Sequence, residues 1–155
     1  MRLTNDDCWR HLGAADHGVL CTAGAQERID AVPVCFAVVL RSIVTPIDRV
    51  KPKETTELGR LRNLRRNVNA TLLCDHWNLS DWSQLWWVRA HLVRRSGLDA
   101  SPMLLQECET ALREKYVQYQ DADFAELILF DVQALVGWSA AADQTAVSDV
   151  TEPLM

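Results

Sequence analysis

The chain has 155 residues, which is enough for one domain with a substantial core and too few for two ordinary domains. Hydrophobic residues make up 48% and charged residues 24% of it, so the composition excludes a disordered or fibrous protein. No apolar run approaches the ~18–20 residues that a membrane-spanning helix needs. The first residues are polar and form no apolar signal region, so we expect a cytoplasmic protein without a membrane partner.

The N-terminal half predicts one short helix followed by three strands. Thr4 is a suitable N-cap for the helix, because acidic residues follow it in the first turn. Residues 17–22 and 31–39 are typical of two strands that are joined by a glycine-containing turn. Pro33 in the second run indicates an edge strand or a bulge, since proline donates no ladder hydrogen bond. Residues 42–46 form a third short strand.

The second half predicts two helices, near residues 54–66 and 101–115, and three strands, at residues 70–75, 84–93 and 125–132. Strands dominate, and the connections are too short for repeated parallel crossovers. We therefore expect a mainly β fold, an antiparallel and nearly closed barrel of about six strands with peripheral helices. One domain spans residues 1–142, and the polar tail 143–155 is expected to fray.

The cysteines and histidines indicate no metal site. The five cysteines are widely spread, odd in number and without C-x-x-C spacing, which argues against a disulfide framework and a structural zinc site. The four histidines show no metal-ligand spacing either. We expect no bound metal.

Positive charge is concentrated in one segment of an acidic chain. Seven basic and two acidic residues lie between Arg49 and Arg66, whereas the net charge of the chain is −5. Lys51 and Lys53 stand between a strand and a helix start, where ammonium groups and free backbone N–H groups favour a phosphate. A solvated loop before a capped helix is the alternative. The segment also suits nucleic acid, but the acidic balance counts against that partner, and we expect none.

A second concentration is aromatic. Trp77, Trp82, Trp86 and Trp87 fall within eleven residues of a chain that has six tryptophans. Neighbours on a strand point to opposite faces, so either Trp86 or Trp87 must face a helix, a partner chain or a ligand. Such rings suit a planar heteroaromatic ligand or a subunit interface. Arg89 shares the strand face of Trp87, where it would pair with a nearby aspartate or reach the phosphate of the lysines.

Several motifs follow one another in a recognisable order: Val32-Pro33-Val34-Cys35-Phe36, Ile43-Val44-Thr45-Pro46-Ile47-Asp48, Lys51-Pro52-Lys53 and Leu61-Arg62-Asn63-Leu64. This order resembles the pyridoxamine 5′-phosphate oxidase-like split barrels. The stretch from Asp75-His76-Trp77 to Val88-Arg89-Ala90, with Gly137-Trp138-Ser139-Ala140, is similar to an actinobacterial branch of coenzyme F-420 (deazaflavin)-dependent enzymes. The resemblance covers roughly residues 10–140.

The resemblance implies a split-barrel homodimer that binds FMN or coenzyme F-420 at the subunit interface. It implies hydride transfer between this cofactor and a small unsaturated substrate, with no protein acid or base. A cofactor-binding protein without turnover, for storage or sensing, is the alternative. By motif position the implied cofactor-binding residues are Thr45 beside the ring, Lys51 and Lys53 at the phosphate, Asn63 on the next helix, Trp87 and Arg89 facing the cofactor, and Trp138 closing the partner's site.

The hairpin before the Val-Pro-Val segment departs from this pattern. Relatives carry D-G-R-P-H there, whereas Ile29 and Asp30 replace the proline and the histidine in this chain. The departure predicts an altered substrate, weaker cofactor binding or lost activity.

Overall fold

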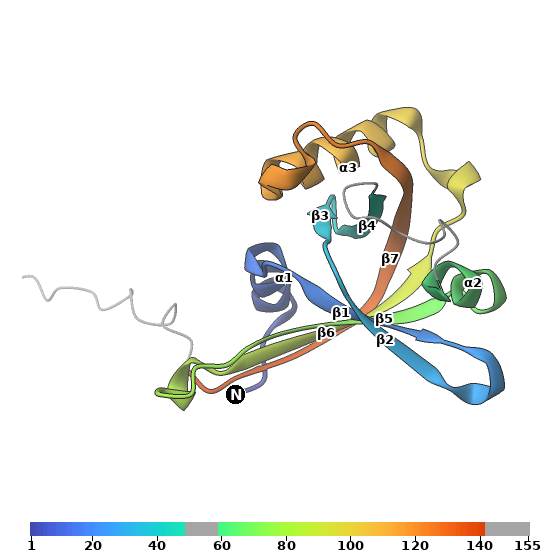
Figure 1. The fold of residues 1–155 in the computed structure, drawn as a ribbon. Coiled ribbons are helices and arrows are strands. Elements are labelled where there is room, and N and C mark those ends of the chain that lie inside the picture. Colours follow the sequence, from blue (N-terminus) through green and yellow to red (C-terminus); the bar gives the residue numbers. More distant parts are fainter. Residues whose placement is uncertain (49–58, 142–155) are drawn as a thin grey trace, which may run out of the picture.

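A computed structural model describes residues 1–48 and 59–141, and within them the chain forms one seven-stranded sheet and three α-helices (Figure 1). The strands are β1 (Gly18–Ala23), β2 (Ile29–Val34), β3 (Ala37–Val39), β4 (Ser42–Asp48), β5 (Asn69–His76), β6 (Trp86–Arg94) and β7 (Phe124–Ser139). The helices are α1 (Asn5–Ala14), α2 (Gly59–Arg66) and α3 (Pro102–Lys115).

The strand order is β2-β1-β5-β6-β7-β4-β3, with antiparallel neighbours throughout. The expected mainly β split barrel is confirmed, although it has seven strands rather than about six. The additional strand arises because the prediction of a single strand over residues 31–39 is wrong. β2 pairs with β1, whereas β3 pairs with β4 at the other edge of the sheet. As expected, Pro33 lies on an edge strand.

The chain changes partner between β2 and β3 at Cys35 and Phe36. The backbone N–H of Phe36 donates to the hydroxyl of Tyr116 at 3.1 Å, and the Phe36 side chain is fully buried. Tyr116 follows α3 directly, and its hydroxyl donates to the carbonyl of Asp16 at 2.6 Å. The corner is therefore held by a side chain that is 80 residues away in sequence, a contact that local pattern does not reveal.

β7 has 16 residues and is twice as long as predicted. Its first part pairs with β4, from Phe124 to Asp131, and its second part pairs with β6, from Phe130 to Ser139. Trp138 therefore lies within the strand rather than after it. The strand extends beyond residue 132 because β6 offers it a second partner, which the residues of β7 alone do not indicate.

Two apolar clusters hold the sheet and its helices together. The larger one fills the barrel and includes Leu20, Leu72, Val88 and Phe130, and the smaller one packs α3 against β3, β4 and β7. β4 contributes to both, since Ile43 belongs to the larger cluster and its neighbour Val44 to the smaller one. Figure 1 shows β4 on the side of the sheet where α3 lies. Residues 42–47 of β4 are therefore buried on both faces of the strand.

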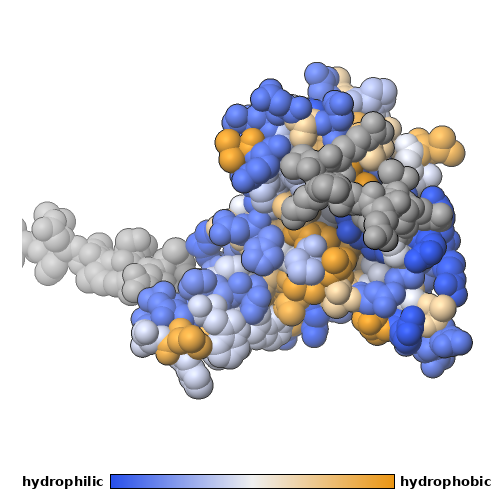
Figure 2. Space-filling model, in the orientation of Figure 1, coloured by the Kyte–Doolittle hydropathy of each residue, from blue (hydrophilic) through white to orange (hydrophobic). Residues whose placement is uncertain are grey.

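Apolar side chains also remain at the surface. Figure 2 shows hydrophobic residues gathered near the centre of one face, with hydrophilic residues around them. Ile29, Leu73, Trp77 and Trp82 are among the large apolar side chains that are more than one third exposed. None of the helices that the structure describes is both long enough and apolar enough to cross a membrane.

α1 closes one end of the barrel. Thr4 caps this helix as predicted, accepting from the backbone of Asp7, and the Asp7 carboxylate accepts from Thr4 in return. One turn further on, the ring of His11 lies 4.4 Å from that of Trp86 (centroid to centroid). Partial burial lowers the pKa of His11, and nearby Arg10 lowers it further, against a weaker opposing effect of Asp7.

We predict that stability falls at acid pH through His11. Because its folded pKa lies below the ordinary value of 6.5, the stabilising contribution is complete above pH 6.5 and is lost as pH falls through the lowered pKa. Substituting His11→Phe keeps an aromatic ring against Trp86 without the charge. Urea unfolding between pH 7.5 and 5 should show a smaller loss of stability for H11F than for the wild type. Parallel pH profiles of the two proteins would contradict this role.

Candidate functional site

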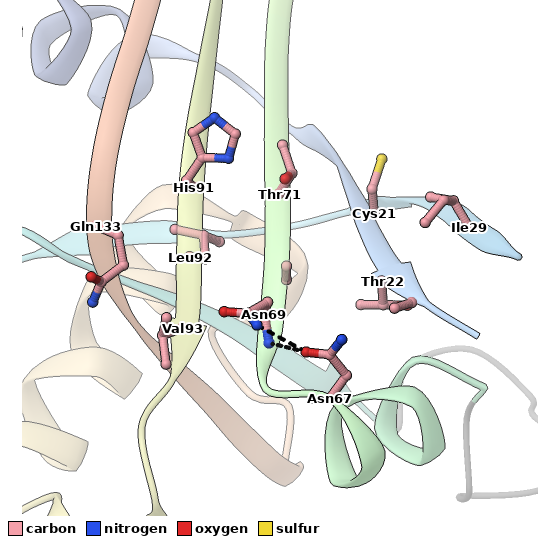
Figure 3. Close-up of a pocket in the computed structure, with 12 residues that line it drawn as sticks. Cys21, Thr22, Ile29, Asn67, Asn69, Thr71, His91, Leu92, Val93 and Gln133 are labelled. Carbon is pink, nitrogen blue, oxygen red and sulfur yellow. Dashed lines mark hydrogen bonds between the residues drawn. The ribbon is translucent and has the colours of Figure 1, made fainter. Parts of the chain in front are cut away.

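The outer face of the sheet is where the predicted aromatic residues gather. Along β5 and β6 the even-numbered residues face the barrel, and the odd-numbered ones point outward. Cys21, Thr71 and His91 are register partners on β1, β5 and β6 and form a row across this face (Figure 3). Two adjoining pockets share Cys21 and Thr71, one of about 370 Å³ toward His91 and one of about 440 Å³ toward Trp87.

The pocket toward Trp87, here the tryptophan pocket, has mainly apolar walls. Its lining consists of Cys21, Thr71, Leu73, Asp75, Trp77, Trp87 and Arg89. The Arg89 guanidinium carbon lies 5.8 Å from the centroid of the Trp87 ring, which is a cation–π distance. Among the described residues Arg89 forms no ion pair, and Asp81 instead accepts from Ser83 and Gln84. The guanidinium is thus available to an anionic group of a ligand.

The adjacent tryptophans separate as strand geometry predicts. Trp86 turns inward against His11, whereas Trp87 lines the pocket. Trp138 is the register partner of Trp87 on β7, so both rings belong to the outer face. Trp87, Arg89 and Trp138 thus lie on the same face of the sheet, and their roles toward a cofactor stay predictions.

The thiol of Cys74, which lies on the barrel side of β5 behind this pocket, is unreactive. Cys74 lies between Leu73 and Asp75 but points into the barrel, and only 1% of it is exposed. Burial raises the pKa of its thiol to about 12, which leaves almost no thiolate at neutral pH. Cys74 is accordingly no nucleophile.

Asn63 lies in a different place, between α2 and the β1–β2 hairpin. Its side-chain amide donates to the Thr22 hydroxyl at 3.0 Å and to the Asp30 carboxylate at 2.8 Å. Asn63 and Thr22 are 5% and 2% exposed. A pocket of about 530 Å³ opens beside this network, and Arg28, Arg62 and Arg66 are among its lining residues.

Thr45 is fully buried in β4, and its hydroxyl has no hydrogen-bond partner among the described residues. An unpaired buried hydroxyl is uncommon, and the assignment of Thr45 to a position beside the cofactor ring stays a prediction. Lys51 and Lys53 lie outside the described residues, so their assignment to a phosphate stays a prediction.

One subunit does not bring all predicted residues together. Thr22, beside Asn63, pairs with Ala70 of β5, whereas Trp87 pairs with Asp75 of the same strand. Five residues of a strand span about 17 Å, so the tryptophan pocket and the Asn63 network lie at opposite ends of β5. The sequence prediction omitted Leu73, Asp75 and Trp77 from the site. Strand alternation, which places Leu73 and Asp75 on the face of Trp87, was the signal that identifies the first two.

Comparison with known proteins identifies the fold of the chain but assigns it to no family. No protein-family model matches the chain, and no curated protein does. A conserved hypothetical protein of Mycobacterium tuberculosis is similar in structure, with a TM-score of 0.68, 14% identity, and coverage of 89% of this chain and 86% of the other. A FAD-binding protein of Mesorhizobium loti has a TM-score of 0.63, 12% identity and coverage of 88% and 95%.

A Corynebacterium glutamicum protein assigned provisionally as a pyridoxamine 5′-phosphate oxidase has a TM-score of 0.60, 12% identity and coverage of 88% and 94%. Haem-binding proteins also share this fold. The structural neighbours thus include flavin-binding and pyridoxamine 5′-phosphate oxidase-like split barrels. At these identities they establish the fold alone, and function has to be argued from the site.

We predict that Asn63→Leu lowers the free energy of unfolding by about 1–3 kcal/mol, because it leaves the buried Thr22 hydroxyl and the Asp30 carboxylate without their donor. The double variant T22V/N63L should recover part of this loss, since one of the two orphaned groups is then apolar. Urea titration of the single and double variants measures both effects. An unchanged midpoint in N63L would show that the network contributes nothing to stability.

Proposed function

We propose that the protein binds a flavin-type cofactor, a flavin or the deazaflavin F-420, and transfers hydride between it and a small unsaturated substrate. The observation that carries the proposal is the tryptophan pocket, where Trp77 and Trp87 stand beside an arginine that has no ion pair within the described residues. The similarity of the fold to that of flavin-binding proteins supports it.

The lining of the pocket suits one end of such a cofactor. A three-ring system is planar and apolar on its faces, which matches stacking on tryptophan and contact with Leu73. The volume of the tryptophan pocket, about 440 Å³, lies within the range of small-molecule sites. Arg89 and Asp75 are charged groups that would orient the polar edge, one as a donor and the other as an acceptor.

Hydride exchange at the ring is the chemistry that the cofactor supplies when it is bound. The protein's part is to hold the ring and to exclude water through Trp77, Trp87 and Leu73. No side chain of the pocket is assigned as an acid or base. The five cysteines are free, which supports a reducing compartment such as the cytoplasm.

A homodimer is part of the same proposal. The outer face presents apolar residues from three neighbouring strands, among them Ile29, Cys21 and Leu73. A second copy of this chain would cover that surface. A two-fold arrangement would also supply a partner's groups to a tryptophan pocket that is far from the Asn63 network of its own subunit.

We predict that Trp87→Leu and Arg89→Gln each weaken binding of FMN or F-420 about 10- to 100-fold, from the loss of stacking or of a charge-assisted hydrogen bond. Titration of the purified protein, followed by cofactor fluorescence, measures this. Arg41→Gln is the matched control, because Arg41 is exposed and does not line the pocket. Equal affinity in W87L, R89Q and the wild type would exclude the tryptophan pocket as the cofactor site. Binding without reduction of any substrate in a screen would favour the storage or sensing alternative.

A charge at the centre of the outer face should separate the subunits. We expect Leu73→Glu to convert a dimer into a monomer in sedimentation velocity and to weaken cofactor binding at the same time. Leu98→Glu is the control, because Leu98 is 97% exposed and lies outside the sheet. A monomeric wild type, or an L73E variant that stays dimeric, would refute this interface.

A further inference from the structure

The pocket of about 370 Å³ on the outer face, here the histidine pocket, adjoins the tryptophan pocket. Thr71, His91 and Gln133 are among its lining residues. The two pockets share Cys21 and Thr71 as walls. A ligand in the histidine pocket can therefore contact a ring system that is bound in the tryptophan pocket.

Gln133 reaches this face through an irregularity in the pairing of β6 with β7. His91 pairs with Ala134, whereas Leu92 pairs with Val132, so Gln133 is an extra residue between the two pairs. Leu92 and Val132 both pack in the barrel core, and His91 lies on the opposite face of the sheet. A bulge of this kind re-aims a side chain and is common beside active sites. Here it adds the amide of Gln133 to the face that carries His91 (Figure 3).

Three hydrogen-bonding side chains of the histidine pocket have no protein partner. Within residues 1–48 and 59–141, the side chains of Thr71, His91 and Gln133 form no hydrogen bond and no ion pair, and the His91 ring stacks on no other ring. They come from three neighbouring strands, β5, β6 and β7. Their hydroxyl, imidazole and amide groups can all donate to a carbonyl oxygen of a ligand. Side chains that are fixed on a sheet in this way form a preorganised set of donors.

The histidine pocket offers no charged partner to a ligand. Neither an acidic residue nor a lysine or arginine is among the described residues that line it, whereas the tryptophan pocket contains Arg89 and Asp75. A carboxylate or phosphate placed there would lose hydration without gaining an opposite charge, which is costly. The second copy that we propose on the outer face would remove still more water. The pocket therefore selects against an anionic ligand.

We propose that the histidine pocket receives the hydride acceptor, and that this substrate is an uncharged molecule whose double bond is conjugated to a carbonyl group. The inference rests on the proposed function. Thr71, His91 and Gln133 donate hydrogen bonds to the carbonyl oxygen. Apolar walls of the pocket, among them Ile29 and Val93, contact the rest of the substrate.

The reaction explains why donors are needed at this position. Hydride passes from the reduced cofactor to the carbon β to the carbonyl, and the electron pair of the C=C bond moves toward the carbonyl oxygen. Hydrogen bonds from Thr71, His91 and Gln133 stabilise the negative charge that develops on this oxygen. A proton from water then adds at the α carbon. The substrate gains two electrons and two hydrogens, and the cofactor loses the same two electrons.

The test measures equilibrium binding of two matched probes, trans-cinnamamide and trans-cinnamate, which have the same skeleton and differ in charge. The full-length protein is first loaded with oxidised FMN or F-420, so neither probe is reduced. Dissociation constants come from NMR titration, and the visible absorption of the bound cofactor reports contact between the two ligands.

The variants are H91L/Q133L, H91Q and Q133R. Both positions are exposed, so these proteins should fold normally. The control H17L/Q118L changes the same two residue types at exposed positions that line neither pocket.

We expect the wild type to bind cinnamamide about tenfold or more tightly than cinnamate, and bound cinnamamide to shift the absorption of the cofactor. H91L/Q133L should weaken binding of cinnamamide about tenfold and leave cofactor affinity within about twofold, because neither residue lines the tryptophan pocket. H91Q should keep most of the affinity, since glutamine also donates. Q133R should raise the affinity for cinnamate about tenfold and so remove the preference. The control should behave as the wild type does.

The inference is overturned if the wild type binds the two probes equally or not at all, or if H91L/Q133L binds cinnamamide as tightly as the wild type. A cofactor spectrum that cinnamamide leaves unchanged would also overturn it, because the two ligands would then not touch. In each of these cases binding of FMN or F-420 still supports the proposed function. If neither cofactor binds, the proposed function is wrong and the assignment of a hydride acceptor fails with it.

Discussion

The length of β7 is the constraint on which the rest of the structure depends. This one strand pairs with β4 over its first part and with β6 over its second, and so it joins the two halves of the sheet. The pairing register shifts between His91 and Leu92 of β6, and such an irregularity increases local twist. Because β7 is long and the sheet is twisted, the single sheet curves around the larger apolar cluster. β3 and β4 then present their other face to α3 in the smaller cluster.

The same sheet separates the tryptophan pocket from the Asn63 network. Because side chains alternate, every strand that fills the barrel with one set of residues must present the other set to the outside. β5 and β6 present Leu73, Trp87 and Arg89 at one end. At the other end the β1–β2 hairpin and α2 form the Asn63 network and the arginine-lined pocket beside it.

At the corner between β2 and β3, half-buried polar side chains hold the chain where it changes sheet partner. The ammonium of Lys115 donates to the Phe36 carbonyl at 2.8 Å and lies 3.9 Å from the centroid of the Phe36 ring. Burial lowers the pKa of Lys115 and raises that of Tyr116. Both side chains hydrogen-bond the same short segment, so they satisfy backbone groups where the chain changes partner and no ladder is available.

Local pattern was enough for much of this protein. The Thr4 cap of α1 follows from side-chain chemistry within one turn, and the opposite faces of Trp86 and Trp87 follow from strand geometry. The mainly β barrel class follows from short antiparallel strands, and the shared face of Trp87 and Arg89 follows from strand alternation. Contacts distant in sequence decided the rest. The division of residues 31–39 depends on Tyr116, and the extension of β7 on β6. Strand register decides that Asp30 meets Asn63, and that this network lies far from the tryptophan pocket. Register between segments that are distant in sequence is set by packing of the whole sheet rather than by neighbouring residues.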